Sequence, residues 1–211
     1  MLKRKNFFKF FILVVLLFFI AKIMKERLED YEAKNDFYLN PKWSICAANK
    51  SLLFIAFVVI APHLFEQRSK IRNSWANKQF SSEIKLIFSV GLSPNRAINE
   101  LIHNESALYS DILQINHFND SYYNCTYKIM KTFKWIAKYC PHAKYVLKIC
   151  DDVVVNTPQI LNYFRHLPYE QNQIFGYGIY GVGPIRNVKN KWYVSKNEFN
   201  GTKYDPYVQG K

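Results

Sequence analysis

Short unbroken apolar runs alternate along this chain with longer segments whose apolar residues recur every three or four positions. An unbroken run is typical of a parallel strand buried on both faces, whereas the three-to-four spacing is typical of a helix. The runs predict strands over 52–60, 84–90, 111–115 and from Tyr145 onward, followed by further strands over 173–182 and 192–195. The periodic segments predict helices over 65–75, 97–108, 122–139 and 158–164. Repeated strand–helix units predict an α/β fold, with a mostly parallel sheet and helices on both faces.

The segment Tyr145–Asn156 joins the fourth of these strands to two adjacent carboxylates, Asp151 and Asp152. Acids that follow a parallel strand lie at the carboxyl edge of the sheet, where open α/β folds bind their ligands. Carboxylate oxygens suit Mg²⁺ or Mn²⁺, which usually share their site with a substrate diphosphate. A solvated acidic turn is the alternative interpretation, and the acid pair alone does not separate the two.

The N-terminal segment 7–24 is apolar except for lysines near its ends, Lys9 and Lys22. Its length and composition predict a transmembrane helix that acts as an uncleaved signal anchor. A cleaved signal peptide is the competing interpretation, but no small-residue cleavage site follows. We therefore expect a cytoplasmic tail over 1–6, a stem over 25–50 and a luminal domain over 51–211. The anchor also accounts for nearly half of the net charge of +13, which weakens a nucleic-acid interpretation.

Five Asn-x-Ser/Thr triplets agree with a luminal location, where such sites can be glycosylated. They begin at Asn49, Asn104, Asn119, Asn124 and Asn200. The same compartment permits disulfides, but four cysteines allow three complete pairings and the sequence does not choose among them. The cysteines are Cys46, Cys125, Cys140 and Cys150, and neither they nor the histidines have the spacing of a zinc site.

Six segments, taken together and in order, resemble the family of β-1,3-galactosyltransferases and β-1,3-N-acetylglucosaminyltransferases, Golgi enzymes with a GT-A fold. The similarity runs from about Leu52 to the last residue. The segments are Glu66–Trp75, Tyr109–Gln114, Phe118–Asn124, Lys134–Trp135 with Cys140–Tyr145, Lys148–Asn156, and the pair Lys191–Ser195 with Tyr204–Tyr207.

This resemblance implies transfer of galactose or N-acetylglucosamine from a UDP-sugar to a glycan hydroxyl, with inversion and in β-1,3 linkage. The acceptor would be a glycan on a glycoprotein or glycolipid. The resemblance makes Asp152 the expected ligand of Mn²⁺, which would neutralise charge on the departing UDP. The expected substrate-binding residues are Arg68, Arg72, Lys148, Asp151, Lys191 and Trp192. The expected location is the Golgi membrane, with a single span and a luminal C-terminal domain.

Two departures from the family pattern bear on activity. Cys150 stands where the family places the first acid of its metal motif, and a thiol supplies no hard carboxylate oxygen. The family's acidic general base follows the last matched segment, so we expect that residue to lie beyond Lys211 and the catalytic domain to be incomplete at its C-terminus. The alternative hypothesis is therefore a catalytically inactive luminal binding protein, or truncated pseudoenzyme, with the same fold. A membrane-tethered adhesion module is a third interpretation, and no motif supports it.

Overall fold

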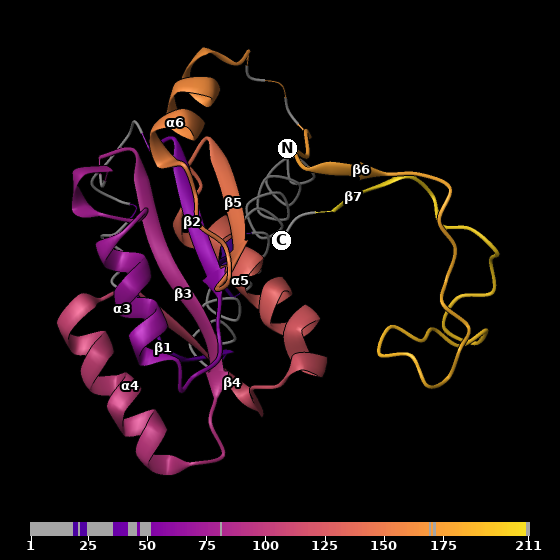
Figure 1. Ribbon diagram of the computed structural model, residues 1–211. Helices are drawn as coiled ribbons and strands as arrows, with labels where there is room; N and C mark the ends of the chain where they lie inside the picture. Colours follow the sequence, from indigo (N-terminus) through magenta and orange to yellow (C-terminus); the bar gives the residue numbers. More distant parts are fainter. Residues whose placement is uncertain are drawn as a thin grey trace, which may run out of the picture.

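The computed structural model describes residues 19–20, 22–24, 36–41, 46, 52–80, 82–168, 170 and 172–209. Its main sheet has five strands in the order β1-β4-β3-β2-β5 (Figure 1). They are β1 (Phe37–Leu39), β2 (Phe54–Val59), β3 (Ile84–Leu92), β4 (Ile112–Asn119) and β5 (Tyr145–Cys150). Strands β2 to β5 are mutually parallel, and only β1 joins antiparallel, at the outer edge of β4. The mostly parallel α/β sheet expected from the sequence is confirmed.

Strand β2 lies in the middle of the sheet and is buried on both faces. Phe54 and Val58 point into a hydrophobic cluster on one face, and Ile55 and Phe57 into a second cluster on the other. Because successive side chains of a strand point to opposite faces, a strand with two buried faces needs apolar residues at every position. This requirement explains the unbroken apolar run in the sequence.

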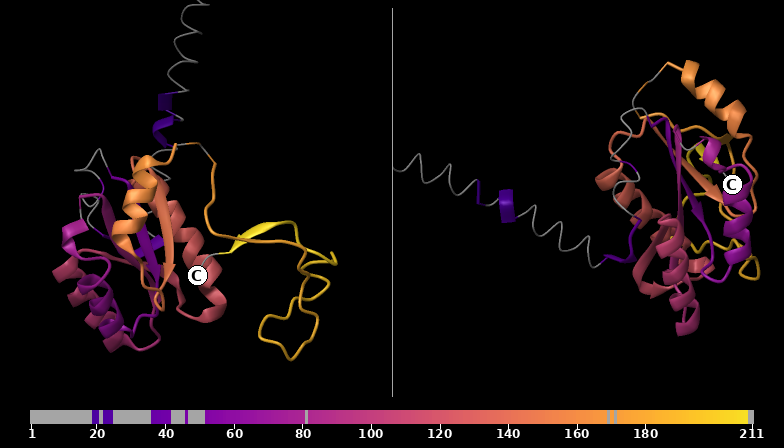
Figure 2. Two further views of the ribbon diagram at one scale, coloured as in Figure 1. Left: turned by 45° about the horizontal axis from the view of Figure 1, so that its top comes forward. Right: turned by 90° about the vertical axis from the view of Figure 1, so that its left-hand side faces the viewer.

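The helices cover the two faces of the sheet unequally (Figures 1 and 2). The first cluster receives Ile71, Ile102 and Leu161, which belong to α3, α4 and α6, and the second receives Trp135 and Ile136 of α5. The bounds are α3 (Phe65–Asn73), α4 (Arg96–Tyr109), α5 (Cys125–Tyr139) and α6 (Thr157–His166). Short 3₁₀ turns, η1 (Lys78–Phe80) and η2 (Tyr122–Asn124), precede β3 and α5.

The helix ends follow local hydrogen-bonding rules. Asn95 caps α4, since its side chain accepts a hydrogen bond from the backbone N–H of Ala97. Asn156 caps α6 in the same way through the backbone N–H of Gln159. In α5 the buried aromatic residue is Trp135, whereas Phe133 is 45% exposed and packs edge-on against Phe57.

Besides its pairing with β4, the short edge strand β1 is connected to α5. Asp36 pairs with Lys131 at 2.6 Å and with Lys134 at 3.4 Å, both of which lie on α5. A disulfide joins Cys46 to Cys140 just after the end of that helix, with Cα atoms 5.2 Å apart. Of the pairings that the sequence left open, the structure therefore contains Cys46–Cys140, and Cys125 and Cys150 are free.

The expected membrane span 7–24 lies mostly outside the described residues. Those described within it, Phe19–Ile20 and Lys22–Met24, are helical and exposed. Across the described parts of the chain, no helix has the length and apolar character needed to cross a bilayer.

After α6 the chain leaves the sheet and forms an extended segment, residues 172–209, which we call the arm (Figure 2). Its regular structure is a two-stranded antiparallel sheet of β6 (Tyr177–Ile179) and β7 (Tyr207–Gln209). The expected strand over 173–182 is thus much shorter, and the expected strand over 192–195 is wrong. There the Asn190 side chain accepts the backbone N–H of Trp192, which favours a turn, and Tyr193 forms only an isolated bridge with Ile185.

Candidate functional site at the carboxyl edge of the sheet

The strand order reverses between β2 and β5. The chain proceeds from β2 to β3 and β4 on one side of β2, and then returns to place β5 on the other side. Val59 pairs with Cys150, so the loop after β2 and the Asp151–Asp152 turn after β5 begin side by side. Open α/β sheets bind ligands at such switch points, outside the carboxyl ends of the strands. Asp151 is half-buried there and Asp152 is exposed.

Arg68 is fully buried beneath this edge and holds the loop after β2. Its guanidinium donates hydrogen bonds to the backbone oxygens of Ala61 and Pro62, at 3.2 and 3.1 Å. It also donates to both carboxylate oxygens of Glu105 on α4, the shortest contact being 2.7 Å. Through these hydrogen bonds, Arg68 holds the loop after β2 in its conformation at the switch point.

Arg72 lies one turn further along α3, towards the amino end of β4. It forms a two-point ion pair with Asp111, which precedes β4, and a 2.7 Å contact with Glu105. Burial acts to lower the pKa of Arg72, but the hydrogen bonds and charges of Asp111 and Glu105 outweigh it and raise that pKa above its ordinary value. The structure therefore places Arg68, but not Arg72, at the switch point.

A second buried cation, Lys128, was not predicted from the sequence. Its ammonium donates to the backbone oxygen of Ile60, just after β2, and to both oxygens of Asp120, just after β4. Asp120 in turn accepts the backbone N–H of Gly91 at 2.6 Å, and a side chain at Gly91 would meet Phe118 and Asp120 at about 3 Å. These groups tie the ends of β2, β3 and β4 together.

A signal for Lys128 did exist in the sequence. It shares a helical face with Thr132 and Trp135, four and seven residues on, and both are buried. A lysine on an apolar face of a helix indicates a buried acidic or carbonyl partner, because an unpaired charge there would be costly.

Lys148 and Cys150 point to the same side of β5, and the lysine ammonium donates to the cysteine sulfur at 3.4 Å. Lys148 therefore faces the residue that replaces the family's first acid. Among the described residues, no three histidine, cysteine, aspartate or glutamate side chains gather as metal ligands.

Lys191 and Trp192 lie in the arm and meet a residue from the sheet domain rather than the acidic turn. The rings of Trp192 and Tyr122 pack edge-on with centroids 5.8 Å apart. The Lys191 ammonium lies 4.3 Å from the Tyr122 ring centroid and 5.0 Å from that of Trp192. Tyr123 packs on Tyr122 and is 90% exposed. We call Tyr122, Tyr123, Lys191 and Trp192 the aromatic cluster.

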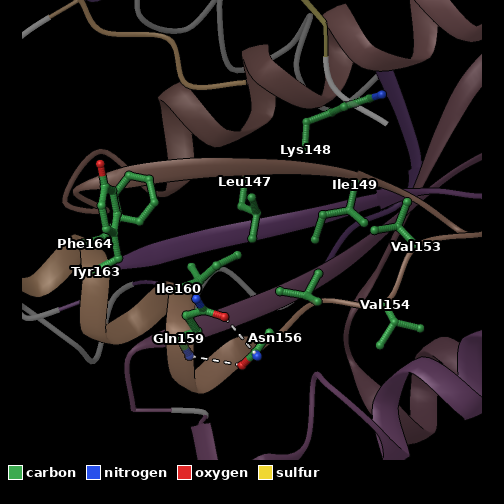
Figure 3. A pocket seen from close by; sticks show the side chains of 11 residues that line it. Leu147, Lys148, Ile149, Val153, Val154, Asn156, Gln159, Ile160, Tyr163 and Phe164 are labelled. Atoms are coloured by element: carbon green, nitrogen blue, oxygen red, sulfur yellow. Dashed lines mark hydrogen bonds between the residues drawn. The ribbon is translucent and has the colours of Figure 1, made fainter. Parts of the chain in front are cut away.

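A pocket of about 440 Å³ lies between β5 and α6 (Figure 3). Its wall is largely apolar, with Ile149 and Ile160 along it and Tyr163 and Phe164 at one end, while Lys148 points away on the opposite side of the strand. Asp151 and Asp152 do not line it. A site that binds a diphosphate needs charged or polar groups, which the largely apolar wall of this pocket does not provide. We therefore place the candidate site at the acidic turn.

Four of the five glycosylation triplets fall on described residues. Asn104, Asn119 and Asn200 are exposed, and Asn124 is half-buried and donates from its side-chain amide to the backbone oxygen of Asn119 at 2.9 Å. Asn49 lies outside the described residues.

The fold and the position of the acidic turn define an open, mostly parallel α/β protein with two adjacent carboxylates at its switch point. The chain belongs to the galactosyltransferase family, whose profile matches residues 66–211. It is 31% identical over 198 residues to lactosylceramide 1,3-N-acetyl-beta-D-glucosaminyltransferase A of Xenopus laevis, covering 89% of this chain and 52% of that protein.

Two human relatives support the same family assignment. The human lactosylceramide 1,3-N-acetyl-beta-D-glucosaminyltransferase is 35% identical over 78% of this chain and 46% of its own length. Human beta-1,3-galactosyltransferase 2 is also 35% identical, over 76% of this chain and 39% of its own length. The chain thus spans about half the length of the curated relatives that it matches, and the family resemblance read from the sequence is confirmed.

Proposed function

We propose that this chain contains the donor-binding part of a hexosyltransferase. The enzyme would transfer galactose or N-acetylglucosamine from a UDP-sugar to a glycan hydroxyl. The transfer would invert the anomeric centre, form a β-1,3 linkage and serve protein glycosylation. The observation that carries this proposal is the Asp151–Asp152 turn at the switch point between β2 and β5, in a chain of the galactosyltransferase family. The relatives' names supply the linkage and the two sugars.

The acidic turn suits a divalent ion that is shared with a diphosphate. Asp152 is exposed at the carboxyl end of β5, so its carboxylate is open to an ion and a substrate. Mg²⁺-like ions are commonly bound by one or two protein carboxylates together with substrate phosphates, so a cage of three protein ligands is not required. We assign Asp152 as the ligand of Mn²⁺ and Asp151 as its neighbour in the donor site. Bound Mn²⁺ would offset the negative charge of the departing UDP.

The loop after β2 forms the other wall of the proposed donor site. Arg68 holds two of its carbonyl groups and Lys128 holds a third, so the loop does not need the ligand to become ordered. A loop ordered in advance costs less conformational entropy on binding. In this proposal the arginine contributes to donor binding through the loop that it shapes, and Lys148 through its position beside the acidic turn.

The aromatic cluster is the proposed contact for the acceptor glycan. Sugars pack their C–H faces on exposed aromatic rings, and Trp192 and Tyr122 offer two rings held in a fixed mutual geometry. Lys191 adds hydrogen-bond donors that suit sugar hydroxyls. The names of two relatives contain lactosylceramide, so a lactose-terminated glycolipid is the first acceptor to test.

We also propose a Golgi membrane location, with the N-terminus in the cytoplasm and the glycosylation triplets in the lumen. The positive residues before segment 7–24 and the exposed Asn104, Asn119 and Asn200 support this orientation. Endoglycosidase treatment of the protein from secretory cells would test it, and we expect a loss of apparent mass.

The decisive experiment is calorimetric titration of UDP into the full chain in mild detergent, with and without Mn²⁺. We expect binding that requires Mn²⁺ and that falls at least tenfold in Asp152→Ala. Asp205→Ala removes an exposed acid in the arm and serves as the matched control, with no change expected. Binding that is independent of Mn²⁺, or equal loss in both variants, would contradict the metal assignment.

One observation favours a second candidate function, a non-catalytic binding protein. Cys150 replaces the first acid of the metal motif, and the Lys148 ammonium donates a hydrogen bond to its sulfur. A Cys150→Asp variant separates the two functions. If the wild type binds UDP without transferring sugar to a lactose-terminated acceptor, and Cys150→Asp restores tighter Mn²⁺-dependent binding, the binding function is supported.

A further inference from the structure

Gln67 joins two segments that are 84 residues apart in sequence, and it is not among the expected substrate-binding residues. Its side-chain amide on α3 donates a 2.7 Å hydrogen bond to the backbone oxygen of Asp151. This oxygen belongs to the peptide group that connects Asp151 to Asp152. A donor fixed on that oxygen therefore restrains the rotation of the whole acidic turn.

The restraint extends from the same helix that shapes the opposite wall of the site. Arg68, the next residue of α3, holds the carbonyls of Ala61 and Pro62 in the loop after β2. The first turn of α3 thus contacts both strand ends that flank the switch point, Arg68 on the β2 side and Gln67 on the β5 side. The two ends already start in register, through the pairing of Val59 with Cys150.

The turn has a particular need for this restraint. Asp152 is exposed and Asp151 is half-buried, so packing alone holds the turn less firmly than the strand before it, whose Ile149 is buried. Exposed turns with few packing contacts are the segments that open most easily. A hydrogen bond to the backbone, rather than to a carboxylate, leaves both acid side chains available for a ligand.

We propose that Gln67 is a positioning residue for the acidic turn, and that it holds the Asp151–Asp152 peptide in the orientation from which Asp152 meets the metal–diphosphate group. The part that concerns the metal rests on the proposed function, whereas the part that concerns the turn does not. The chemical requirement is a hydrogen-bond donor at the end of a side chain of about this length. An isosteric side chain without a donor should fail, and a different side chain with a donor should succeed.

Gln67→Met keeps the length of the side chain and removes the donor, whereas Gln67→Lys keeps a donor at a similar reach. Lys70→Met is the matched control, because it changes an exposed side chain on the same helix. All would be made in the full chain. The first measurement is backbone amide exchange over residues 151–155 without ligand, and the second is calorimetric titration of UDP with Mn²⁺.

For Gln67→Met we expect exchange in the turn to accelerate about five- to tenfold while amides of α4 keep their rates, since one such hydrogen bond contributes about 1 kcal/mol. We expect Mn²⁺-dependent affinity for UDP to fall by a similar factor. Gln67→Lys should restore both quantities, and Lys70→Met should leave both unchanged. Rescue by a donor distinguishes positioning from a general packing role, which a lysine would not restore.

Turn exchange in Gln67→Met that matches the control would overturn the proposal, and so would a failure of Gln67→Lys to restore it. If the wild type does not bind UDP with Mn²⁺ at all, the proposed function fails, but the exchange data still decide whether Gln67 holds the turn. Accelerated exchange with unchanged UDP affinity would overturn the link between the turn's orientation and the ligand.

Discussion

The parallel sheet and the arm are both rich in aromatic and aliphatic residues, but they use these residues differently. In the sheet, apolar side chains such as Ile55, Phe57 and Phe88 are completely buried between helices. In the arm, Ile174, Tyr177 and others remain largely exposed, and the regular structure is limited to β6 and β7. An apolar composition alone therefore does not produce a hydrophobic core. A core forms where paired strands make a sheet whose two faces can be covered by helices.

Two arginines show the same contrast at the level of single residues. Arg68 is fully buried and combines two backbone carbonyls with a carboxylate. Arg186 is half-buried in the arm and donates to the backbone oxygens of Val194, Phe199 and Gly201, at 2.8, 2.6 and 3.0 Å. Arg68 connects α3 with α4 and with the loop after β2, whereas Arg186 makes contacts within one loop of the arm. Their removal should consequently have global and local effects, respectively.

The largest effect is expected from Arg68→Met. It leaves the Glu105 carboxylate with one of its two arginine partners and frees two loop carbonyls, and breaking a buried pair typically costs about 3–5 kcal/mol. Denaturant unfolding measures this loss. Arg96→Met is the matched control, because the Arg96 side chain is 93% exposed and pairs with Glu100, four residues further along the same helix, so a change within about 0.5 kcal/mol is expected. Equal losses would contradict the distinction.

Arg186→Met should affect the arm alone. Loss of its three carbonyl contacts, at about 2 kcal/mol for the local structure, should speed amide exchange between residues 185 and 204 about thirtyfold. The midpoint of thermal unfolding of the sheet should stay unchanged. Lys189→Met, at an exposed position in the same loop, should alter neither quantity. A lowered midpoint in Arg186→Met would show that the arm and the sheet unfold together.

A smaller effect is expected where α5 packs on the sheet. The hydroxyls of Ser89 and Thr132 are buried and 2.7 Å apart, so Thr132→Val removes a partner of Ser89 and should cost about 1–2 kcal/mol in denaturant unfolding. Adding Ser89→Ala should cost less than the sum of the two single changes, because both ends of the pair are then apolar. Thr202→Val, exposed in the arm, should be near neutral. Strict additivity would exclude a coupled pair.

The smallest effect concerns the edge strand β1 and depends on pH. Burial acts to raise the pKa of Asp36, but its hydrogen bond and charge interaction with Lys131, followed by those with Lys134, outweigh it and hold that pKa below its ordinary value. The stabilisation is therefore present above the unfolded pKa of about 3.9 and is lost as pH falls through the folded pKa.

The measurement is urea unfolding of the wild type and Asp36→Asn at pH 7 and at pH 3. We expect a difference of about 0.5–1 kcal/mol at pH 7 that largely disappears at pH 3. Asp205→Asn provides the exposed control in the arm, with little difference at either pH. A difference for Asp36→Asn that does not change with pH would indicate a packing effect instead of the ion pair.

Much of the sheet domain was predictable because its signals are local. The unbroken run at 52–60 indicated a strand with two buried faces, and the three-to-four spacing located α3 to α6 to within a few residues. The acidic turn was found for the same reason, since acids after a buried strand indicate the carboxyl edge of a sheet. The arm was predicted poorly. Its glycines and tyrosines lack a clear period, and the Asn190 side chain favours a turn over the expected strand.

The sequence by itself determined the class of fold, the family and the place of the acidic turn, because alternation, spacing and motif order are properties of neighbouring residues. Only the tertiary structure decided what each charged side chain does. Whether Arg68 and Arg72 meet a ligand or a carboxylate depends on Glu105 and Asp111, more than thirty residues away. The contact of Gln67 with Asp151 likewise exists only because β5 returns beside β2. Pairing across such distances is set by topology, which no local pattern records.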